Sequence, residues 1–168
     1  MKFLCYIYLM FTFTVKDDNH VLIGDSQTFF LKKHSTIVTQ NTKLSQAGIG
    51  ISQLITKVKN YHISPDIKSI TICVGVNDGY VDKGIEQLMT KVKYTFPNAT
   101  IFVIKGSWGW GKVKKVNVDK FNGYYKKFHD LGACIVPTPI GHGDPHKNKK
   151  VYKTIMSELE TKLKMNNP

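Results

Sequence analysis

The sequence contains no arginine, and its 24 basic residues are all lysines. With only 12 acidic residues the formal net charge is +12, an excess that attracts polyanions weakly and without specificity. Specific recognition of phosphates and guanine edges favours the planar guanidinium group of arginine, which donates two parallel hydrogen bonds. We therefore expect no specific nucleic-acid partner.

Cysteine is scarce as well. The three cysteines are Cys5, Cys73 and Cys134, an odd number without the spacing of a zinc site. The last two lie in apolar segments typical of strands, so we expect buried free thiols rather than a disulfide framework. There is also no glycine-rich loop with lysine and hydroxyl residues at Walker spacing, which argues against a nucleotide binder. The sequence implies no metal and no organic cofactor.

Linkers, repeats and low-complexity tracts are absent, so residues 19–168 are predicted to form a single domain. We also expect a monomer. Residues 3–15 are almost entirely apolar and follow Lys2. Their length suits the apolar region of a signal peptide and is too short for a membrane-spanning helix. Residues 1–18 are thus predicted to be a signal or other hydrophobic N-terminal segment. The protein is secreted or membrane-targeted if they act as a signal, and cytoplasmic otherwise.

Short apolar runs alternate with amphipathic helical patterns. The predicted strands are residues 20–24, 36–39, 69–75, 100–105 and 133–137. The predicted helices are residues 51–60, 83–96, 118–131 and 149–164. In the last helix Val151, Ile155, Leu159 and Leu163 form one apolar stripe, so it is expected to close the fold. This alternation predicts an α/β fold, a three-layer α/β/α sandwich with a parallel sheet of about five strands covered by helices on both faces.

Two of these strands end in polar motifs. The first stops at Gly24-Asp25-Ser26, which places a serine at the carboxyl edge of the sheet, where open α/β sheets hold their chemistry. Such a serine also serves simply to begin a helix. The run at residues 73–79 brings Asn77 to the same edge, where its amide could donate a hydrogen bond to a developing oxyanion or form an Asx-turn.

Two loops complete the set of polar motifs. The turn at residues 46–52 contains Gly48 and Gly50, whose backbone N–H groups would face the same edge. The loop at residues 140–148 holds His142, Asp144 and His146. A histidine there could activate a serine hydroxyl, and a carboxylate could orient the imidazole.

Together these four blocks resemble the SGNH hydrolase family, also called GDSL esterases and lipases, from about residue 21 to residue 163. The resemblance implies a flavodoxin-like SGNH hydrolase fold and a serine esterase in which Ser26 is the nucleophile and His146 the base. The oxyanion would be held by the backbone N–H groups of Ser26 and Gly48 with the Asn77 amide, although Gly50 remains an alternative to Gly48.

The last block departs from the family pattern, which spaces its aspartate three residues before the histidine. Here Asp144 precedes His146 by two residues, and Gly143 stands at the usual place. Either Asp144 reaches the imidazole from a shifted turn, or a backbone carbonyl orients it, or His142 is the base. We take Asp144 as the third catalytic residue.

The substrate is less constrained. Trp108 and Trp110 stand between glycines after a predicted strand and could stack on a sugar or line an acyl pocket, or simply pack their loop. The expected substrate is a small-molecule or glycan ester with a short acyl group, first an O-acetylated carbohydrate and second a lipid ester. The alternative is a catalytically silent domain of this fold that binds glycans or an acidic partner.

Overall fold

The computed structural model describes residues 19–35, 43–107, 113–137, 143–144, 146 and 149–166. Within them one parallel sheet contains four strands in the order β1-β2-β3-β4. The strands are β1 (His20–Gly24), β2 (Ser69–Cys73), β3 (Thr100–Ile104) and β4 (Cys134–Val136). The fold class predicted from sequence is confirmed.

The strand count is a correction, since the described sheet has four strands rather than five. The missing strand was expected at residues 36–39, which lie outside the described residues. Where the description resumes, Ser45 forms an isolated parallel bridge with Gly24. At this one residue pair the chain lies beside β1, along the edge that β2 does not occupy.

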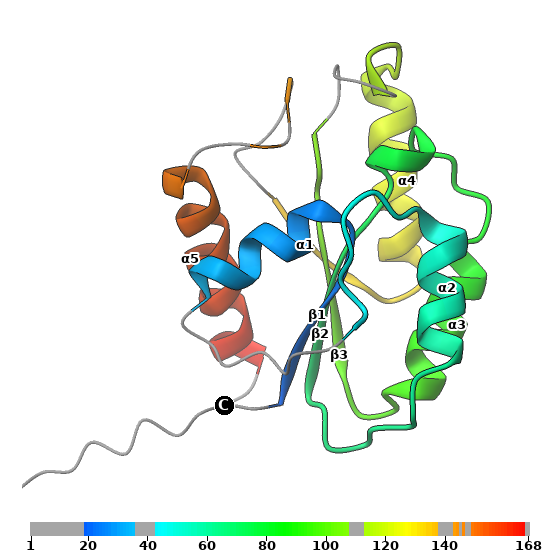
Figure 1. Cartoon of the computed structure of the whole chain (residues 1–168), viewed down its shortest axis with the longest axis vertical. Helices are drawn as coiled ribbons and strands as arrows, with labels where there is room; N and C mark the ends of the chain where they lie inside the picture. Colours follow the sequence, from blue (N-terminus) through cyan, green and yellow to red (C-terminus); the bar gives the residue numbers. More distant parts are fainter. Residues whose placement is uncertain are drawn as a thin grey trace, which may run out of the picture.

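In the described part of the chain, five α-helices cover the two faces of the sheet (Figure 1). They are α1 (Ser26–Leu31), α2 (Ile51–Lys59), α3 (Ile85–Thr95), α4 (Val118–Asp130) and α5 (Lys149–Asn166). Helices α1 and α5 lie on one side of the sheet, and α2, α3 and α4 lie on the other. This is the predicted three-layer sandwich.

The core follows from the alternation of side chains along a strand. In β1, Val21 and Ile23 pack toward α2, α3 and α4, whereas Leu22 packs toward α1 and α5. Both faces of the strand are buried, which explains its uninterrupted apolar sequence. The carboxyl ends of the strands consequently meet at one edge of a rigid sheet.

The four helices predicted from periodicity are confirmed, as is the buried face of α5 at Ile155, Leu159 and Leu163. Helix α1 was not predicted, because six residues are too few to establish a helical period. Cys73 is buried as expected, but the expectation of a buried Cys134 was wrong. Cys134 is the first residue of β4, the last strand of the described sheet, and burial increases along this strand from Cys134 to Val136. None of the described helices combines the length and hydrophobicity needed to cross a membrane.

Candidate active site

The turn between β1 and α1 positions Ser26. Gly24 has a φ of 136°, and a Cβ atom there would lie 2.0 Å from the carbonyl oxygen of Cys73. Only glycine fits this conformation and this close approach. The Asp25 backbone N–H then donates to the same Cys73 carbonyl at 2.9 Å, and Ser26 is the first residue of α1. The sharp turn leaves Ser26 half-buried at the carboxyl edge of the sheet.

The neighbouring Asp25 side chain is buried and caps α1. Its Oδ1 accepts a hydrogen bond from the backbone N–H of Gln27 at 2.9 Å. Burial raises the pKa of Asp25 to about 7, and the negative charge of Asp78 adds to the rise, while the bond from Gln27 opposes it. Asp25 therefore holds the start of the helix in place beside Ser26, a role that the sequence did not reveal.

Ser26, His146 and Asp144 are joined by hydrogen bonds. The Ser26 Oγ lies 3.1 Å from the His146 Nε2, and the His146 Nδ1 lies 3.1 Å from the Asp144 Oδ1. The Asp144 Oδ1 also accepts the backbone N–H of His146 at 2.8 Å. A neutral imidazole with its proton on Nδ1 satisfies both ring contacts, because Nε2 is then free to accept the serine hydroxyl.

The two-residue separation of Asp144 and His146 thus takes the form of an Asx-turn, in which an aspartate accepts the N–H two residues further on. In this turn the same carboxylate oxygen reaches the ring of the residue whose backbone it binds. Of the alternatives left open by the sequence, this geometry favours Asp144 as the partner of the imidazole. His142 lies outside the described residues.

These groups are open to solvent. The side chain of His146 is 40% exposed and that of Asp144 is 50% exposed. Water can therefore reach the imidazole, and solvent screens the carboxylate. The electrostatic support that Asp144 gives His146 is weaker here than in a buried triad.

Asn77 connects two of the sequence blocks. It lies in the 3-10 helix η2 (Val76–Asp78), directly beyond β2, and its Nδ2 donates to the carbonyl oxygen of Ile49 at 2.9 Å. The next residue, Asp78, accepts the backbone N–H of Ile51 at 2.6 Å and so caps α2. An amide nitrogen carries two protons, and the bond to Ile49 uses one of them and fixes the orientation of the amide. Among the described residues the second proton has no acceptor.

The two glycines of the 46–52 turn differ in a way that separates them. The backbone N–H of Gly50 donates to the Gln53 Oε1 at 2.8 Å, and a Cβ atom at Gly50 would lie 2.0 Å from the Asp78 Oδ1. Gly50 therefore makes room for the Asp78 cap. Gly48 has a φ of 78°, and within the described residues its N–H donates to no acceptor. The same holds for the N–H of Ser26.

Buried tyrosines support the Asn77 loop from behind. The Tyr124 hydroxyl donates to the carbonyl oxygen of Val74 at 3.0 Å, and a Cβ atom at Gly75 would lie 2.7 Å from the Tyr124 ring. The Tyr80 hydroxyl donates to the carbonyl of Ser107 beyond β3. Burial raises the pKa values of both tyrosines, so they remain neutral donors. The periodicity of residues 118–131 indicated a helix but not this contact of Tyr124.

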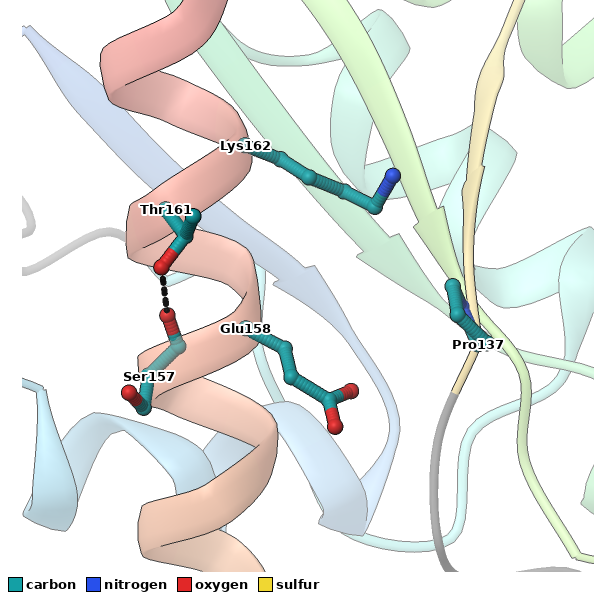
Figure 2. Close-up of a pocket in the computed structure, with 5 residues that line it drawn as sticks. All are labelled: Pro137, Ser157, Glu158, Thr161 and Lys162. Atoms are coloured by element: carbon teal, nitrogen blue, oxygen red, sulfur yellow. Dashed lines mark hydrogen bonds between the residues drawn. The ribbon is translucent and has the colours of Figure 1, made fainter.

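The site residues predicted at Trp108 and Trp110 lie outside the described residues. Among the residues that are described, no group of three or more potential ligands could hold a metal ion. Figure 2 shows a pocket of about 310 Å³ between α5 and Pro137, where the Thr161 hydroxyl donates to the Ser157 carbonyl at 2.9 Å. Its lining includes none of the hydrogen-bonded residues Ser26, His146 and Asp144.

Comparison with solved structures shows that the fold is similar to that of lipolytic proteins of the G-D-S-L family. A protein from Bacteroides fragilis NCTC 9343, proposed to be an acylhydrolase, is 11% identical, with 90% of this chain and 89% of that one covered and a TM-score of 0.64. A G-D-S-L family member from Veillonella parvula DSM 2008 is 10% identical, with coverages of 84% and 96% and a TM-score of 0.58.

A third similar structure is the C-terminal catalytic domain of peptidoglycan O-acetyltransferase A from Streptococcus pneumoniae, solved with a methylsulfonyl adduct. The two chains are 15% identical, and the match covers 88% of this chain and 93% of that domain with a TM-score of 0.58. No protein-family profile and no curated protein sequence matches this chain. These structures confirm, at the level of the fold, the resemblance to GDSL proteins that the four sequence blocks predicted.

Proposed function

We propose that this protein is a serine esterase that hydrolyses carboxylic esters through an acyl-enzyme. The observation that carries the proposal is the hydrogen-bonded series Ser26, His146 and Asp144 at the carboxyl edge of the sheet. A serine hydroxyl becomes nucleophilic when a positioned base can remove its proton, and an imidazole whose tautomer is fixed by a carboxylate is such a base.

In the first half-reaction the Ser26 Oγ attacks the ester carbonyl carbon while its proton passes to the His146 Nε2. The resulting oxyanion accepts hydrogen bonds from the N–H groups of Ser26 and Gly48 and from the second amide proton of Asn77. The C–O bond then breaks, and the alcohol leaves with the proton from Nε2. This gives an acyl group on Ser26 and a neutral imidazole.

In the second half-reaction a water molecule attacks the acyl carbon and gives its proton to the His146 Nε2. The collapse of the second oxyanion returns that proton to Ser26 and releases the carboxylic acid. The solvent exposure of His146 supports water as the acceptor. Orientation of Asn77 by Ile49 before substrate arrives supports its role, because preorganised donors need no rearrangement during the reaction.

For the substrate we propose an O-acetylated carbohydrate. A groove of about 590 Å³ is lined by residues of α2 and α3 and by Asp78, the residue after Asn77. Its lining combines the apolar residues Ile51 and Ile55 with polar groups that include Lys59 and Gln87. Such a mixture suits a sugar, which presents both hydroxyl groups and apolar C–H faces.

The proposal is tested with p-nitrophenyl esters of increasing acyl length. We expect a burst of p-nitrophenol equal to the enzyme concentration, faster turnover of acetate than of octanoate, and loss of about 10³-fold or more in Ser26→Ala. Ser157→Ala, which removes an exposed hydroxyl on α5, should retain full activity. Turnover no faster than that of Ser26→Ala would refute the proposal, and retention of an acetylated glycan without turnover would establish the silent binding domain.

The carbohydrate assignment has its own test. Gln87→Ala should raise KM for an acetylated oligosaccharide severalfold and leave hydrolysis of p-nitrophenyl acetate unchanged, because only the larger substrate reaches the groove. Equal KM values of the wild type and Gln87→Ala for the oligosaccharide would exclude the groove as the binding site of this substrate.

A further inference from the structure

Helix α1 carries a second residue on the face that holds Ser26. Phe30 follows Ser26 by four residues, and side chains at this separation lie one above the other on a helix. The Phe30 ring lies 5.7 Å from the His146 imidazole, centroid to centroid, with an interplanar angle of 80°. One helical face therefore contacts the imidazole twice, through the Ser26 hydroxyl and through an aromatic ring.

Phe30 is itself held in place. Its ring packs against Tyr152 of α5 at a centroid distance of 5.7 Å, and Tyr152 stacks on His34 at 6.1 Å with an interplanar angle of 19°. The Tyr152 hydroxyl donates to the Gln27 Oε1 at 3.2 Å. Tyr152 is buried, so Phe30 is backed by a side chain anchored in α5 and bonded to α1.

We propose that Phe30 is a positioning residue for His146, an inference that rests on the proposed esterase function. The imidazole is 40% exposed, and its carboxylate partner stands on the same short loop, only two residues away. A carboxylate that belongs to the same loop fixes the ring relative to the loop but not relative to α1. The edge-to-face contact with Phe30 ties the ring to α1 at a second point beside the Ser26 hydroxyl, in a geometry that aromatic pairs prefer.

The contact has a consequence for catalysis. A base must stay within hydrogen-bond distance of the proton that it removes, and small displacements lower the rate. Loss of the ring should therefore reduce the reaction of Ser26 without altering the affinity for a reagent that does not touch Phe30. Phe29 offers a matched control, because it is an adjacent phenylalanine that is 46% exposed and packs against Phe30 at 5.8 Å.

The first test measures the rate of covalent labelling of Ser26 by a fluorophosphonate, resolved into the binding constant and the maximal rate of inactivation. Phe30→Ala should lower the maximal rate by about tenfold, a fraction of the contribution of a general base, with an unchanged binding constant. Phe30→Tyr should restore most of the rate and Phe29→Ala should match the wild type. Wild-type rates in Phe30→Ala would overturn the proposal.

The second test does not depend on activity. Histidine is labelled with ¹³C at Cε1, and the His146 resonance is assigned by its loss in His146→Asn. In Phe30→Ala this resonance should shift, because the ring current of Phe30 disappears. The order parameter of the His146 side chain should also fall. Phe29→Ala should leave both nearly unchanged. An unaltered His146 resonance in Phe30→Ala would refute the positioning role, whereas absence of labelling in the wild type with a shifted resonance would count against the esterase function alone.

Discussion

The Asp144 Oδ1 lies 2.8 Å from the backbone nitrogen of His146 and 3.1 Å from the Nδ1 of the same residue. One carboxylate oxygen thus binds both the backbone and the side chain of the proposed base. The spacing that departs from the SGNH pattern is therefore compatible with a carboxylate–imidazole–hydroxyl series, since an Asx-turn brings the two groups together.

Asp144→Asn should lower esterase activity by about ten- to a hundredfold. The amide can still accept the backbone N–H of His146, but it no longer stabilises the imidazolium with a negative charge. The loss should be smaller than for a buried triad because Asp144 is half exposed. Asp66→Asn changes an exposed carboxylate elsewhere and should leave kcat unchanged. Equal kcat values for Asp144→Asn and Asp66→Asn would remove Asp144 from the mechanism.

Asn77→Ala should reduce kcat by about 100- to 1,000-fold, the usual effect of removing one oxyanion donor. Asn117→Ala is the matched control, because its side chain accepts the Lys120 N–H at 2.8 Å to cap α4. That change should reduce the free energy of unfolding by about 1 kcal/mol with little effect on kcat. Steady-state kinetics and urea unfolding of both variants separate the two roles. A retained kcat in Asn77→Ala would contradict the oxyanion assignment.

Gly24→Ala should destabilise the fold by several kcal/mol and abolish activity, because the new Cβ would collide with the Cys73 carbonyl at a positive φ. Gly123→Ala offers the opposite case, since a Cβ there meets no atom within 4 Å and the residue lies inside α4. It should raise the free energy of unfolding by about 0.4–1 kcal/mol. Thermal unfolding measures both effects, and a stable, active Gly24→Ala would show that this turn does not position Ser26.

Asp25 should make the fold less stable as the pH rises. Burial raises its pKa from 3.8 to about 7, so the folded state holds the proton more tightly than the unfolded state does. Its contribution is complete below about pH 4 and is lost as the pH rises toward 7, with a slope of up to about 1.4 kcal/mol per pH unit. Between pH 4 and 7, Asp25→Asn should gain stability relative to the wild type in urea titrations. A constant difference would show that the carboxyl group is not perturbed.

His20 should make the fold less stable as the pH falls, over nearly the same pH range in which Asp25 makes it less stable as the pH rises. Burial lowers its pKa from 6.5 to about 4, while its Nδ1 contacts the Ser69 Oγ at 2.6 Å. The unfolded state therefore takes up the proton first, and stability is lost as the pH falls from about 6.5 to 4. His20→Gln should be relatively more stable than the wild type at pH 4 than at pH 7. The double variant His20→Gln/Asp25→Asn should lose both contributions to the pH dependence of stability. Additive effects of the two substitutions would show that the two sites titrate independently.

The parts of this structure that the sequence predicted are those that depend on one segment at a time. The apolar run of β1 that ends at Ser26, and the stripe along α5, identify a strand and a helix without knowledge of their neighbours. Because parallel strands bring their carboxyl ends to one edge, the relative placement of Ser26 and Asn77 followed from the fold class.

The remaining features depend on contacts between segments far apart in the sequence. The Asp78 cap on α2, the Tyr124 hydroxyl behind Val74 and the Phe30 contact with His146 each join residues more than 25 positions apart. A lone aspartate, tyrosine or phenylalanine carries no local signal of such a partner. Helix α1 escaped prediction for another reason, since its six residues are shorter than two helical turns.

The central claim is that Ser26 is an activated nucleophile, and its most direct test is labelling with a fluorophosphonate followed by intact-mass measurement and peptide mapping. The account predicts a single adduct on the peptide that contains Ser26, and no adduct in a folded Ser26→Ala protein. Folded wild-type protein that remains unlabelled, or that carries its adduct on another residue, would contradict it.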